Sequence, residues 1–366
     1  MKFQIQRETL LKPLQQVIGV VERRQTLPVL GNVLVNAGAT GLELTATDLE
    51  VELQARVELK VEQAGEITIP ARKLFDICRT LPEGVTMTVS LKDDRILVQG
   101  GRSRFTLATL PAAEFPLVEP MAGSRQFTVA QREFRELIER THFSMAQQDV
   151  RYYLNGLMLE LNPDSVRAVA TDGHRLALSD MVASVDGAEG QQVIVPRKGI
   201  QELVRLLEDS DDQARVEIGS NHIRVATPEL RFTSKLIDGR FPDYQRVVPK
   251  GGDKTVLADR ESLRQALTRT SILSNEKYRG IRLNLDPGML RIQAHNPEQE
   301  QADEELEVEY QGAALEIGFN VTYLLDALAA LRTGQVELIL SDSNSSCLVQ
   351  EPGSTRCQYV VMPMRL

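Results

Sequence analysis

The residues best suited to chemistry in this chain are an aspartate and a histidine close together in sequence. Asp172 and His174 lie two positions apart in the segment AVATDGHRLAL. Such a pair suggests a hydrolase that uses acid–base catalysis. A general base also needs a nucleophile and an orienting partner, and the sequence identifies neither. We therefore expect His174 to be a structural or pocket-lining histidine.

Short acidic runs and cysteines are the other candidates for a functional site. Neither group has the spacing of metal ligands, so we expect no bound metal. Asp93-Asp94 and the run 209–212 lie in expected turns without the spacing of cation ligands. Cys78, Cys347 and Cys357 form no CxxC pair and are odd in number, which argues against a zinc site or a disulfide framework. The sequence contains neither GxxxxGK[ST] nor GxGxxG. We expect no cofactor.

Length and composition limit the classes of protein to which the chain can belong. The chain has 366 residues, 42% of them apolar and 25% charged, with a net charge of -9. This composition is typical of a globular protein and excludes disordered, fibrous and membrane classes. The N-terminal segment MKFQIQRETLLKP has no apolar core, and no 18 apolar residues run together. We expect two or three domains in a cytoplasmic protein.

Three features recur at almost one spacing, which indicates an internal repeat. Pro70 and Pro196 each end a strand before an amphipathic helix, and Asn320 holds the same place 124 residues after Pro196. Polar turns at Asp48, Asp172 and Asn296 are spaced by 124 and 124. The strand ends FPLVEP and FPDYQRVVP are 126 apart, and YVVMPMRL closes the third copy. The chain is therefore expected to contain three domains, at 1–122, 123–246 and 247–366.

Each repeat shows many short alternating strands and two brief helices. The expected helices cover 10–24, 72–79, 125–140, 197–208, 260–269 and 320–332. These segments together carry a net charge of +8 and the rest of the chain -17. The pattern predicts an α+β fold in which helices cover one face of each antiparallel sheet. If all helices face one way, that face is basic and the sheet face is acidic.

Many co-linear segments resemble one protein family over essentially the full chain. They include LLKPLQQV, TDLE, IPARKLFDICR, GRSRF, DVRYYLNG, VATDGHRLA, IVPRKG, SKLIDGRFPDY, ILSNEKYRG, HNPEQE, GFNVTYLLD and YVVMPMRL. The family is the bacterial DNA polymerase III beta subunits, the sliding clamps. The resemblance implies three similar domains of antiparallel sheet plus two helices, in a non-catalytic homodimer that closes head to tail into a six-domain ring. A basic interior would then hold duplex DNA through weak, sequence-independent contacts.

The resemblance also implies partners and residues. Expected partners are duplex DNA, the replicative polymerase, an ATP-driven clamp loader, translesion polymerases, ligase and mismatch-repair proteins. The residues expected to face DNA are Arg24, Arg72, Lys73, Gln148, Arg151, Tyr152, Tyr153, Arg197 and Lys198. The dimer contact is expected between Phe105 and Leu107 at one end and Ile272 and Leu273 at the other.

A partner-peptide pocket is the third implied site. Its expected residues are Leu154, Thr171, Gly173, His174, Arg175, Leu176, Pro242, Arg246, Val247, Tyr278, Asn320, Tyr323, Ser346, Val360, Val361, Met362, Pro363, Met364 and Arg365. The methionines suit a groove that accepts several peptides, because their side chains repack easily. Asn344 stands where relatives can carry an apolar residue, which bears on peptide preference.

Two other functions stay open from the residues alone. One is the hydrolase that would use Asp172 and His174, although a single active site seldom needs a triplicated architecture. The other is a scaffold that binds proteins through the C-terminal groove without encircling DNA. Retention on circular but not linear DNA would separate the ring from the scaffold.

Overall fold

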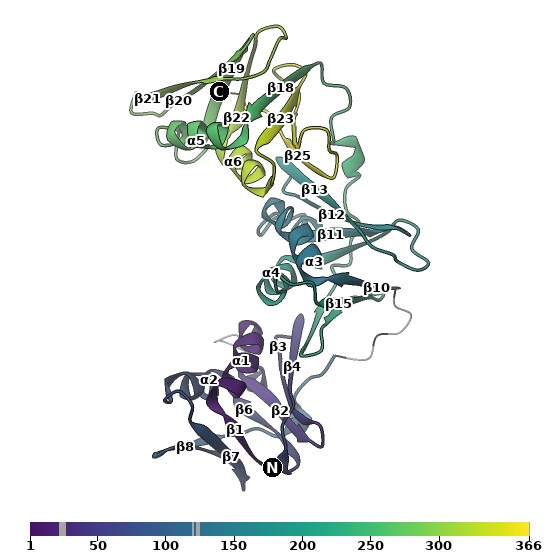
Figure 1. Ribbon diagram of the computed structural model, residues 1–366, viewed down its shortest axis with the longest axis vertical. Helices are drawn as coiled ribbons and strands as arrows, with labels where there is room; N and C mark the ends of the chain where they lie inside the picture. Colours follow the sequence, from purple (N-terminus) through teal and green to yellow (C-terminus); the bar gives the residue numbers. More distant parts are fainter. Residues whose placement is uncertain (22–26, 119–120, 122–124, 366) are drawn as a thin grey trace. The chain divides into compact units, whose positions relative to one another are not determined.

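The structure is a computed structural model that describes residues 1–21, 27–118, 121 and 125–365. The chain forms two compact units (Figure 1). Unit 1 contains Met1–Gln131 and Gln201–Leu236, and unit 2 contains Arg132–Ile200 and Ile237–Leu366. Among the described residues, no helix is long and apolar enough to span a bilayer.

Unit 1 contains a five-stranded sheet in the order β5-β1-β7-β8-β9 and an eight-stranded sheet in the order β10-β15-β16-β17-β4-β3-β2-β6. All neighbouring strands are antiparallel. The strands are β1 (Lys2–Gln6), β2 (Asn32–Gly38), β3 (Gly41–Thr47), β4 (Val51–Val57), β5 (Val61–Gln63), β6 (Gly65–Pro70), β7 (Thr86–Lys92), β8 (Arg95–Gly100), β9 (Ser103–Ala108), β10 (Arg125–Ala130), β15 (Gln213–Ile218), β16 (His222–Ala226) and β17 (Leu230–Lys235).

Unit 2 contains an eight-stranded sheet in the order β14-β11-β12-β13-β25-β24-β23-β18 and a four-stranded sheet in the order β21-β20-β19-β22. These sheets are also antiparallel. The strands are β11 (Gly156–Leu161), β12 (Ser165–Thr171), β13 (Arg175–Val182), β14 (Gln191–Pro196), β18 (Lys254–Asp259), β19 (Gly280–Asp286), β20 (Met289–His295), β21 (Gln301–Glu307), β22 (Leu315–Asn320), β23 (Gln335–Leu340), β24 (Cys347–Gln350) and β25 (Cys357–Val361).

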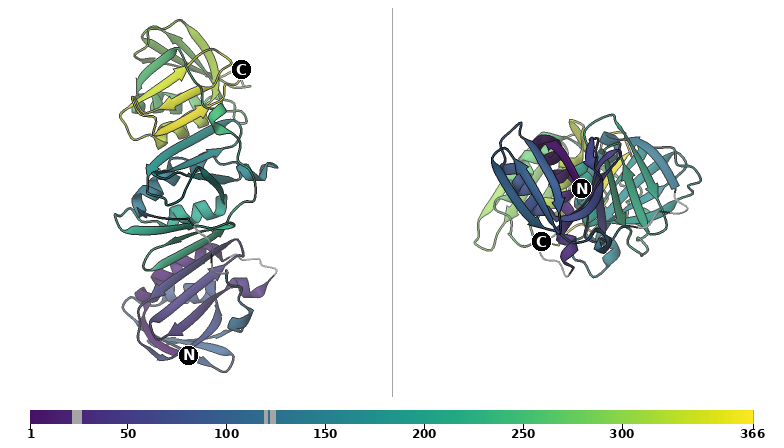
Figure 2. Two further views of the ribbon diagram at one scale, coloured as in Figure 1. Left: turned by 90° about the vertical axis from the view of Figure 1, so that its right-hand side faces the viewer. Right: turned by 90° about the horizontal axis from the view of Figure 1, so that it is seen from below.

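The described residues form six α-helices, two in each predicted repeat. They are α1 (Arg7–Val17), α2 (Ala71–Thr80), α3 (Gln131–Glu139), α4 (Arg197–Leu206), α5 (Arg260–Ser271) and α6 (Val321–Ala330). In unit 1, α1 packs against α2 and strands β3 and β4 (Figure 1 and Figure 2). In unit 2, α5 packs against α6 and strands β20 and β21. The predicted fold class, helices layered on antiparallel sheets, is confirmed.

Burial explains why these helices form where they do. In α2, the buried side chains of Ala71, Leu74 and Cys78 recur at helical spacing and face the sheet. In α6, the Oδ1 atom of Asn320 accepts a hydrogen bond from the backbone N–H of Thr322 at 2.9 Å. This contact satisfies one of the unpaired donors at the start of the helix.

Four predicted helices differ from the observed bounds by one or two residues at an end, and two differ by more. Residues 125–130, predicted as helix, form β10, because the buried side chains of Phe127 and Val129 alternate with polar ones and therefore follow the period of a strand. The first helix begins at Arg7 instead of residue 10 and ends at Val17, followed by a 3-10 turn at Ile18–Val20. The remainder of that predicted helix, at 22–24, lies outside the described residues.

The strands of the middle repeat are shared between the two eight-stranded sheets. Strand β17 pairs with β4 of the first repeat, and β13 pairs with β25 of the third. Each eight-stranded sheet therefore joins two repeats by backbone hydrogen bonds, and the candidate site lies at the second of these junctions.

Candidate functional site

A small, mostly apolar cavity lies at the junction of β13 and β25 in unit 2. Its volume is about 160 Å³. It is enclosed by the β12–β13 turn, a 3-10 turn at Tyr152–Leu154, a segment that follows Ile237, and the C-terminal strand. The lining residues are Arg151, Leu154, Thr171, Gly173, Arg175, Leu176, Pro242, Tyr244, Val247, Val360 and Met362.

The turn between β12 and β13 is fixed by its own side chains. The Thr171 hydroxyl donates to the backbone oxygen of Arg175 at 2.6 Å and accepts from the N–H of Gly173 at 3.1 Å. The Asp172 carboxylate accepts from the N–H groups of His174 and Arg175, at 2.9 and 3.1 Å. Gly173 has a φ of +88°, which favours glycine. The sequence TDGHR therefore encodes one wall of the cavity.

Arg175 is a structural cation at the base of this wall. Its guanidinium donates to the carboxylates of Asp172 at 3.1 Å and Asp326 at 2.5 Å, and to the backbone oxygen of Phe143 at 2.8 Å. The rings of Tyr323 and Phe143 lie 4.5 and 5.5 Å from its Cζ atom. These contacts neutralise the charge and fix the side chain. Asp172 is thus engaged in a structural network, which does not resemble the acid–base pair of a hydrolase.

Arg151 covers the same turn from the other side. Its guanidinium forms a two-pronged ion pair with Asp149, at 3.0 and 2.8 Å, and contacts the backbone oxygen of Asp172 at 3.3 Å. The hydrogen bond from Arg151 lowers the pKa of Asp149 to about 2. A Cβ atom added to Gly173 would lie 3.0 Å from two guanidinium nitrogens. A larger residue here would therefore press on the guanidinium as well as strain the backbone.

The C-terminal strand supplies the opposite wall. Val360 is buried and pairs with Leu176 across the β13–β25 ladder. Val361 is also buried and belongs to the core of the third repeat, so it does not line the cavity. Met362 follows with 39% of its surface exposed, and its backbone N–H donates to the oxygen of His174 at 3.0 Å.

The last described residues reach a second cavity, of about 500 Å³. The N–H of Met364 donates to the backbone oxygen of Gly318 at 2.8 Å and attaches this segment to β22. The second cavity is lined by Asn275, Tyr278, Gly280, His295, Asn296, Pro297, Gln299, Met364 and Arg365. The segment after β25 therefore separates an apolar cavity from a larger one rich in amides.

The predicted pocket residues divide into three groups. Nine line the first cavity: Leu154, Thr171, Gly173, Arg175, Leu176, Pro242, Val247, Val360 and Met362. Three line the second: Tyr278, Met364 and Arg365. The others line neither, namely His174, Arg246, Asn320, Tyr323, Ser346, Val361 and Pro363. Tyr244 lines the first cavity and was missed, although it follows the recognised FPD sequence directly.

The residues predicted to face DNA occupy three places among the described residues. Arg72 and Lys73 lie in the first turn of α2, and Arg197 and Lys198 in the first turn of α4. Arg72 donates to the backbone oxygen of Val21 at 2.6 Å, and Arg197 to that of Met145 at 3.1 Å. The third place is the segment with Gln148, Arg151, Tyr152 and Tyr153. Arg24 lies outside the described residues.

The predicted dimer residues lie on an edge strand of one sheet and at the end of a helix that packs on another. Phe105 and Leu107 are half-buried on β9, which ends the five-stranded sheet of unit 1. Ile272 is 74% exposed and caps the C-terminal end of α5, with half-buried Leu273 beside it. Helix α5 packs on β21, which ends the four-stranded sheet of unit 2.

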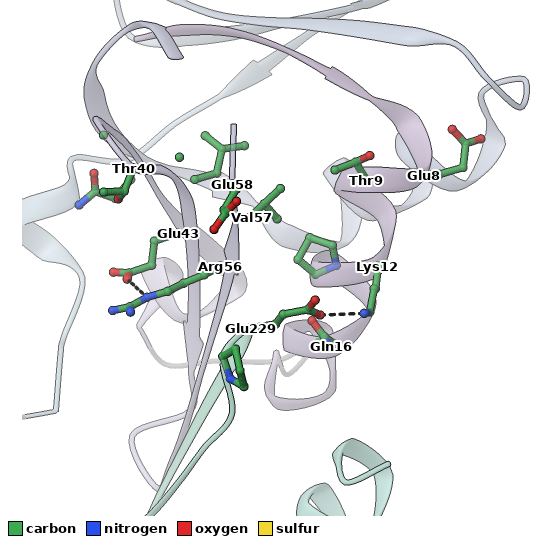
Figure 3. A pocket seen from close by; sticks show the side chains of 16 residues that line it. Glu8, Thr9, Lys12, Gln16, Thr40, Glu43, Arg56, Val57, Glu58 and Glu229 are labelled. Carbon is green, nitrogen blue, oxygen red and sulfur yellow. Dashed lines mark hydrogen bonds and ion pairs between the residues drawn. The ribbon is translucent and has the colours of Figure 1, made fainter. Parts of the chain in front are cut away.

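A groove in unit 1 has a volume of about 1110 Å³ (Figure 3). Helix α1 forms one side and strands β3 and β4 another. Lys12 pairs with Glu229 at 2.8 Å and Arg56 with Glu43 at 2.9 Å within it. None of the described residues that were predicted to bind DNA, a partner peptide or a second chain lines this groove. Within the described part of the chain, no group of three or more His, Cys, Asp or Glu residues is arranged to bind a metal.

Comparison with known proteins matches the whole chain to one family. Profiles of the DNA polymerase III beta subunit match in order: the N-terminal domain to residues 1–119, the central domain to 128–243 and the C-terminal domain to 245–365. A beta sliding clamp of Pseudomonas putida is 60% identical, and that of Escherichia coli K12 is 53% identical, each over 100% of both chains.

Solved structures give the same result. A crystal structure of the DNA polymerase sliding clamp from Pseudomonas aeruginosa matches with a TM-score of 0.97 and 60% identity over 100% of both chains. A beta sliding clamp of Caulobacter crescentus matches with a TM-score of 0.94 and 40% identity, covering 100% of this chain and 99% of that one.

Proposed function

The chain belongs to the DNA polymerase III beta subunit family, and we propose that it acts as a sliding clamp that encircles duplex DNA and tethers the replicative polymerase. The observation that carries this proposal is the ordered match of all three family domains, with 53–60% identity over the full chain to relatives named beta sliding clamp. Members of this family are non-catalytic processivity factors. The protein would act in the cytoplasm on replicating DNA.

Two open sheet borders support a head-to-tail dimer. Within the described part of the chain, strands β9 and β21 each lack a paired strand on one side, and such an edge readily pairs with another strand. The β9 side carries Arg102 and Arg104, whereas β21 carries Asp303, Glu305 and Glu307. A joint between β9 of one chain and β21 of another would therefore combine opposite charges with the apolar residues beside them. Because the two edge strands differ, each joint must combine β9 of one chain with β21 of the other. Two such joints close a ring of two chains.

The N-terminal turns of α2 and α4 support a DNA contact that does not read sequence. Arg72 with Lys73 and Arg197 with Lys198 hold equivalent positions in the first and second repeats. Both arginines are oriented by a backbone carbonyl. Cationic groups attract phosphate without distinguishing bases, so a ring lined by such residues would slide. We propose the boundaries 1–122, 123–246 and 247–366 for its three domains.

The apolar cavity between β13 and β25 supports a docking site for partner peptides. Leu154, Leu176, Val247, Val360 and Met362 supply a neutral surface for aliphatic or aromatic anchors. We propose that the polymerase, the clamp loader, translesion polymerases, ligase and mismatch-repair proteins share it. A Pseudomonas aeruginosa clamp 60% identical to this chain has been crystallised bound to griselimycin, and we propose that this chain also binds it.

Peptide titration tests the pocket. Fluorescence anisotropy would follow a fluorescein-labelled decapeptide with leucine and phenylalanine anchors, with griselimycin as competitor. The variant with Val247→Ala and Met362→Ala should bind about tenfold or more weakly, because both side chains line the cavity. Val182→Ala is the control, since that valine is 85% exposed on β13 and outside the cavity. Equal affinity of both variants would refute the pocket.

Retention on DNA tests the ring. The chain would be loaded onto a nicked circular plasmid by a clamp loader with ATP, and the complex isolated by gel filtration. Cutting the plasmid once should release the protein, because a ring slides off free ends. Sedimentation should give a dimer of the 40.8 kDa chain. Retention on the linear plasmid would refute the ring, and a monomer that binds peptide normally would favour the scaffold instead.

A further inference from the structure

One wall of the apolar cavity has little regular structure. The segment 237–248, here called the lip, contributes Pro242, Tyr244 and Val247 to the lining. Its regular structure is one 3-10 turn at Tyr244–Arg246. Ile237 donates its N–H to the backbone oxygen of Ile194. Side chains must therefore hold the rest of the lip in place.

Backbone hydrogen bonds farther along the lip run between its own residues. The N–H of Arg246 donates to the oxygen of Asp243, and those of Val247 and Val248 both donate to the oxygen of Tyr244. Phe241 and Tyr244 are buried in the apolar cluster beneath the cavity. Apolar packing holds the lip against the protein. It does not fix the orientation of the lip, because apolar contacts lack the directionality of a hydrogen bond.

Below the lip, three charged residues form a row across the sheet. Glu160 on β11 is the cross-strand partner of Arg167 on β12, which is the partner of Asp180 on β13. The Arg167 guanidinium donates two hydrogen bonds to Asp180, at 2.6 and 2.8 Å. This two-pronged ion pair holds the guanidinium in a defined plane.

Tyr244 connects the lip to this row. The Nη1 group of Arg167 donates to the Tyr244 hydroxyl at 3.1 Å, and the hydroxyl donates to the Glu160 carboxylate, with both oxygens at 3.2 Å. The Arg167 Cζ atom also lies 5.9 Å from the centre of the Tyr244 ring. The hydroxyl accepts a hydrogen bond from one charged group and donates one to another. It therefore has a single favourable orientation. Tyr244 is only 3% exposed, so water cannot easily replace these partners.

We propose that Tyr244 is the positioning residue of the pocket, and that its hydroxyl, held between Arg167 and Glu160, fixes the lip so that Pro242 and Val247 close over a bound apolar anchor. This inference rests on the proposed peptide pocket. A lip held in place before binding leaves the encounter with the peptide unchanged but slows its escape. The hydroxyl therefore controls how long a partner stays bound.

Tyr244→Phe is the direct test, because it removes the hydroxyl and keeps the ring. Stopped-flow anisotropy with the labelled leucine–phenylalanine decapeptide would give association and dissociation rate constants on the full dimeric chain. Dissociation should be about five- to tenfold faster, with association changed less than twofold. Hydrogen exchange at the amides of Val247 and Val248 should also accelerate.

A matched control separates this role from general stability. Tyr310 is 2% exposed, and its hydroxyl donates to the oxygen of Ala313 at 2.6 Å, but it does not line the cavity. Tyr310→Phe should change the melting temperature by a similar amount and leave peptide dissociation unchanged. Glu160→Gln keeps an acceptor for the Tyr244 hydroxyl and should retain most of the wild-type residence time.

The outcomes distinguish this inference from the proposed function. If the wild-type chain binds the decapeptide and Tyr244→Phe releases it at the wild-type rate, the positioning role is overturned and the pocket stands. If the wild-type chain does not bind the peptide, the pocket and this inference both fail. Should Tyr244→Phe not fold, Arg167→Gln removes the donor to the same hydroxyl, and a wild-type dissociation rate in that variant overturns the role equally.

Discussion

Replacing Gly173 with alanine adds one carbon atom to the wall of the pocket. The residue lies in the β12–β13 turn with a φ of +88°, and its added Cβ would stand 3.0 Å from two nitrogens of the Arg151 guanidinium. The new atom must move that guanidinium, because such contacts are shorter than ordinary van der Waals distances. Arg151 keeps its ion pair with Asp149 but loses its 3.3 Å contact with the oxygen of Asp172. Because Arg151 lines the cavity, this shift changes the shape of the cavity wall.

Two effects contribute to the expected magnitude. Alanine at positive φ costs about 1–2 kcal/mol of folding free energy, and the lower entropy of its unfolded chain offsets about 0.4–1 kcal/mol. The net loss of unfolding free energy should therefore be about 1 kcal/mol. The moved guanidinium should weaken peptide binding about three- to tenfold, which corresponds to about 0.7–1.4 kcal/mol.

Gly190→Ala separates the two effects. Gly190 also belongs to unit 2 and has a φ of +70°, but nothing lies within 4 Å of an added Cβ. Urea unfolding should show a similar loss of stability in both variants, whereas anisotropy with the labelled peptide should show weaker binding only for Gly173→Ala. Equal peptide affinity in the two variants would refute the role that we assign to the Arg151 guanidinium at this turn.

Two further predictions concern the dimer and pH. The variant with Ile272→Ala and Leu273→Ala should sediment as a monomer, because each buried aliphatic side chain contributes about 2–5 kcal/mol at a well-packed joint; a dimer at micromolar concentration would contradict the proposed joint. Burial, with a smaller contribution from nearby Arg197, lowers the pKa of His142 below its ordinary 6.5, so the unfolded chain binds more protons and stability falls as pH drops below about 6.5. In urea titrations, His142→Gln should therefore lose less unfolding free energy than the wild type between pH 8 and pH 5.5. Identical pH profiles of the two proteins would show that His142 is not the source of the pH dependence.

Sequence periodicity predicted the repeat and the fold class because both follow from local patterns. Polar turns and strand-ending prolines recur in each copy, and a helix with one apolar stripe must cover a sheet. Residues 125–130 were misassigned, since RQFTVA precedes a strong helical pattern and its two-residue alternation is short. Pairing between β13 and β25 joins segments about 180 residues apart, and hydrophobic pattern alone does not select which strands become neighbours.

The candidate site was predictable where chain neighbours form it. The TDGHR turn encodes its own hydrogen bonds, so its local structure follows from neighbouring residues; that it binds a partner peptide stays a prediction. The C-terminal residues were predicted as one group but divide between two cavities, because Met364 bonds to Gly318 on β22. No sequence pattern indicates that contact. Tyr244 was missed because its importance depends on Arg167, a residue 77 positions away in the chain.

The charges around the apolar cavity bear on how the proposed pocket would serve several partners. Both lining cations are neutralised within the protein: Arg175 by Asp172 and Asp326, and Arg151 by Asp149. A partner therefore gains little by presenting a carboxylate to either guanidinium, since it would have to displace an existing ion pair. What the cavity offers instead is apolar area and the fit of Met362, whose flexible side chain adapts to different anchors. Selectivity among the proposed partners would then arise outside this cavity, from the residues that flank the anchor and the surfaces they meet.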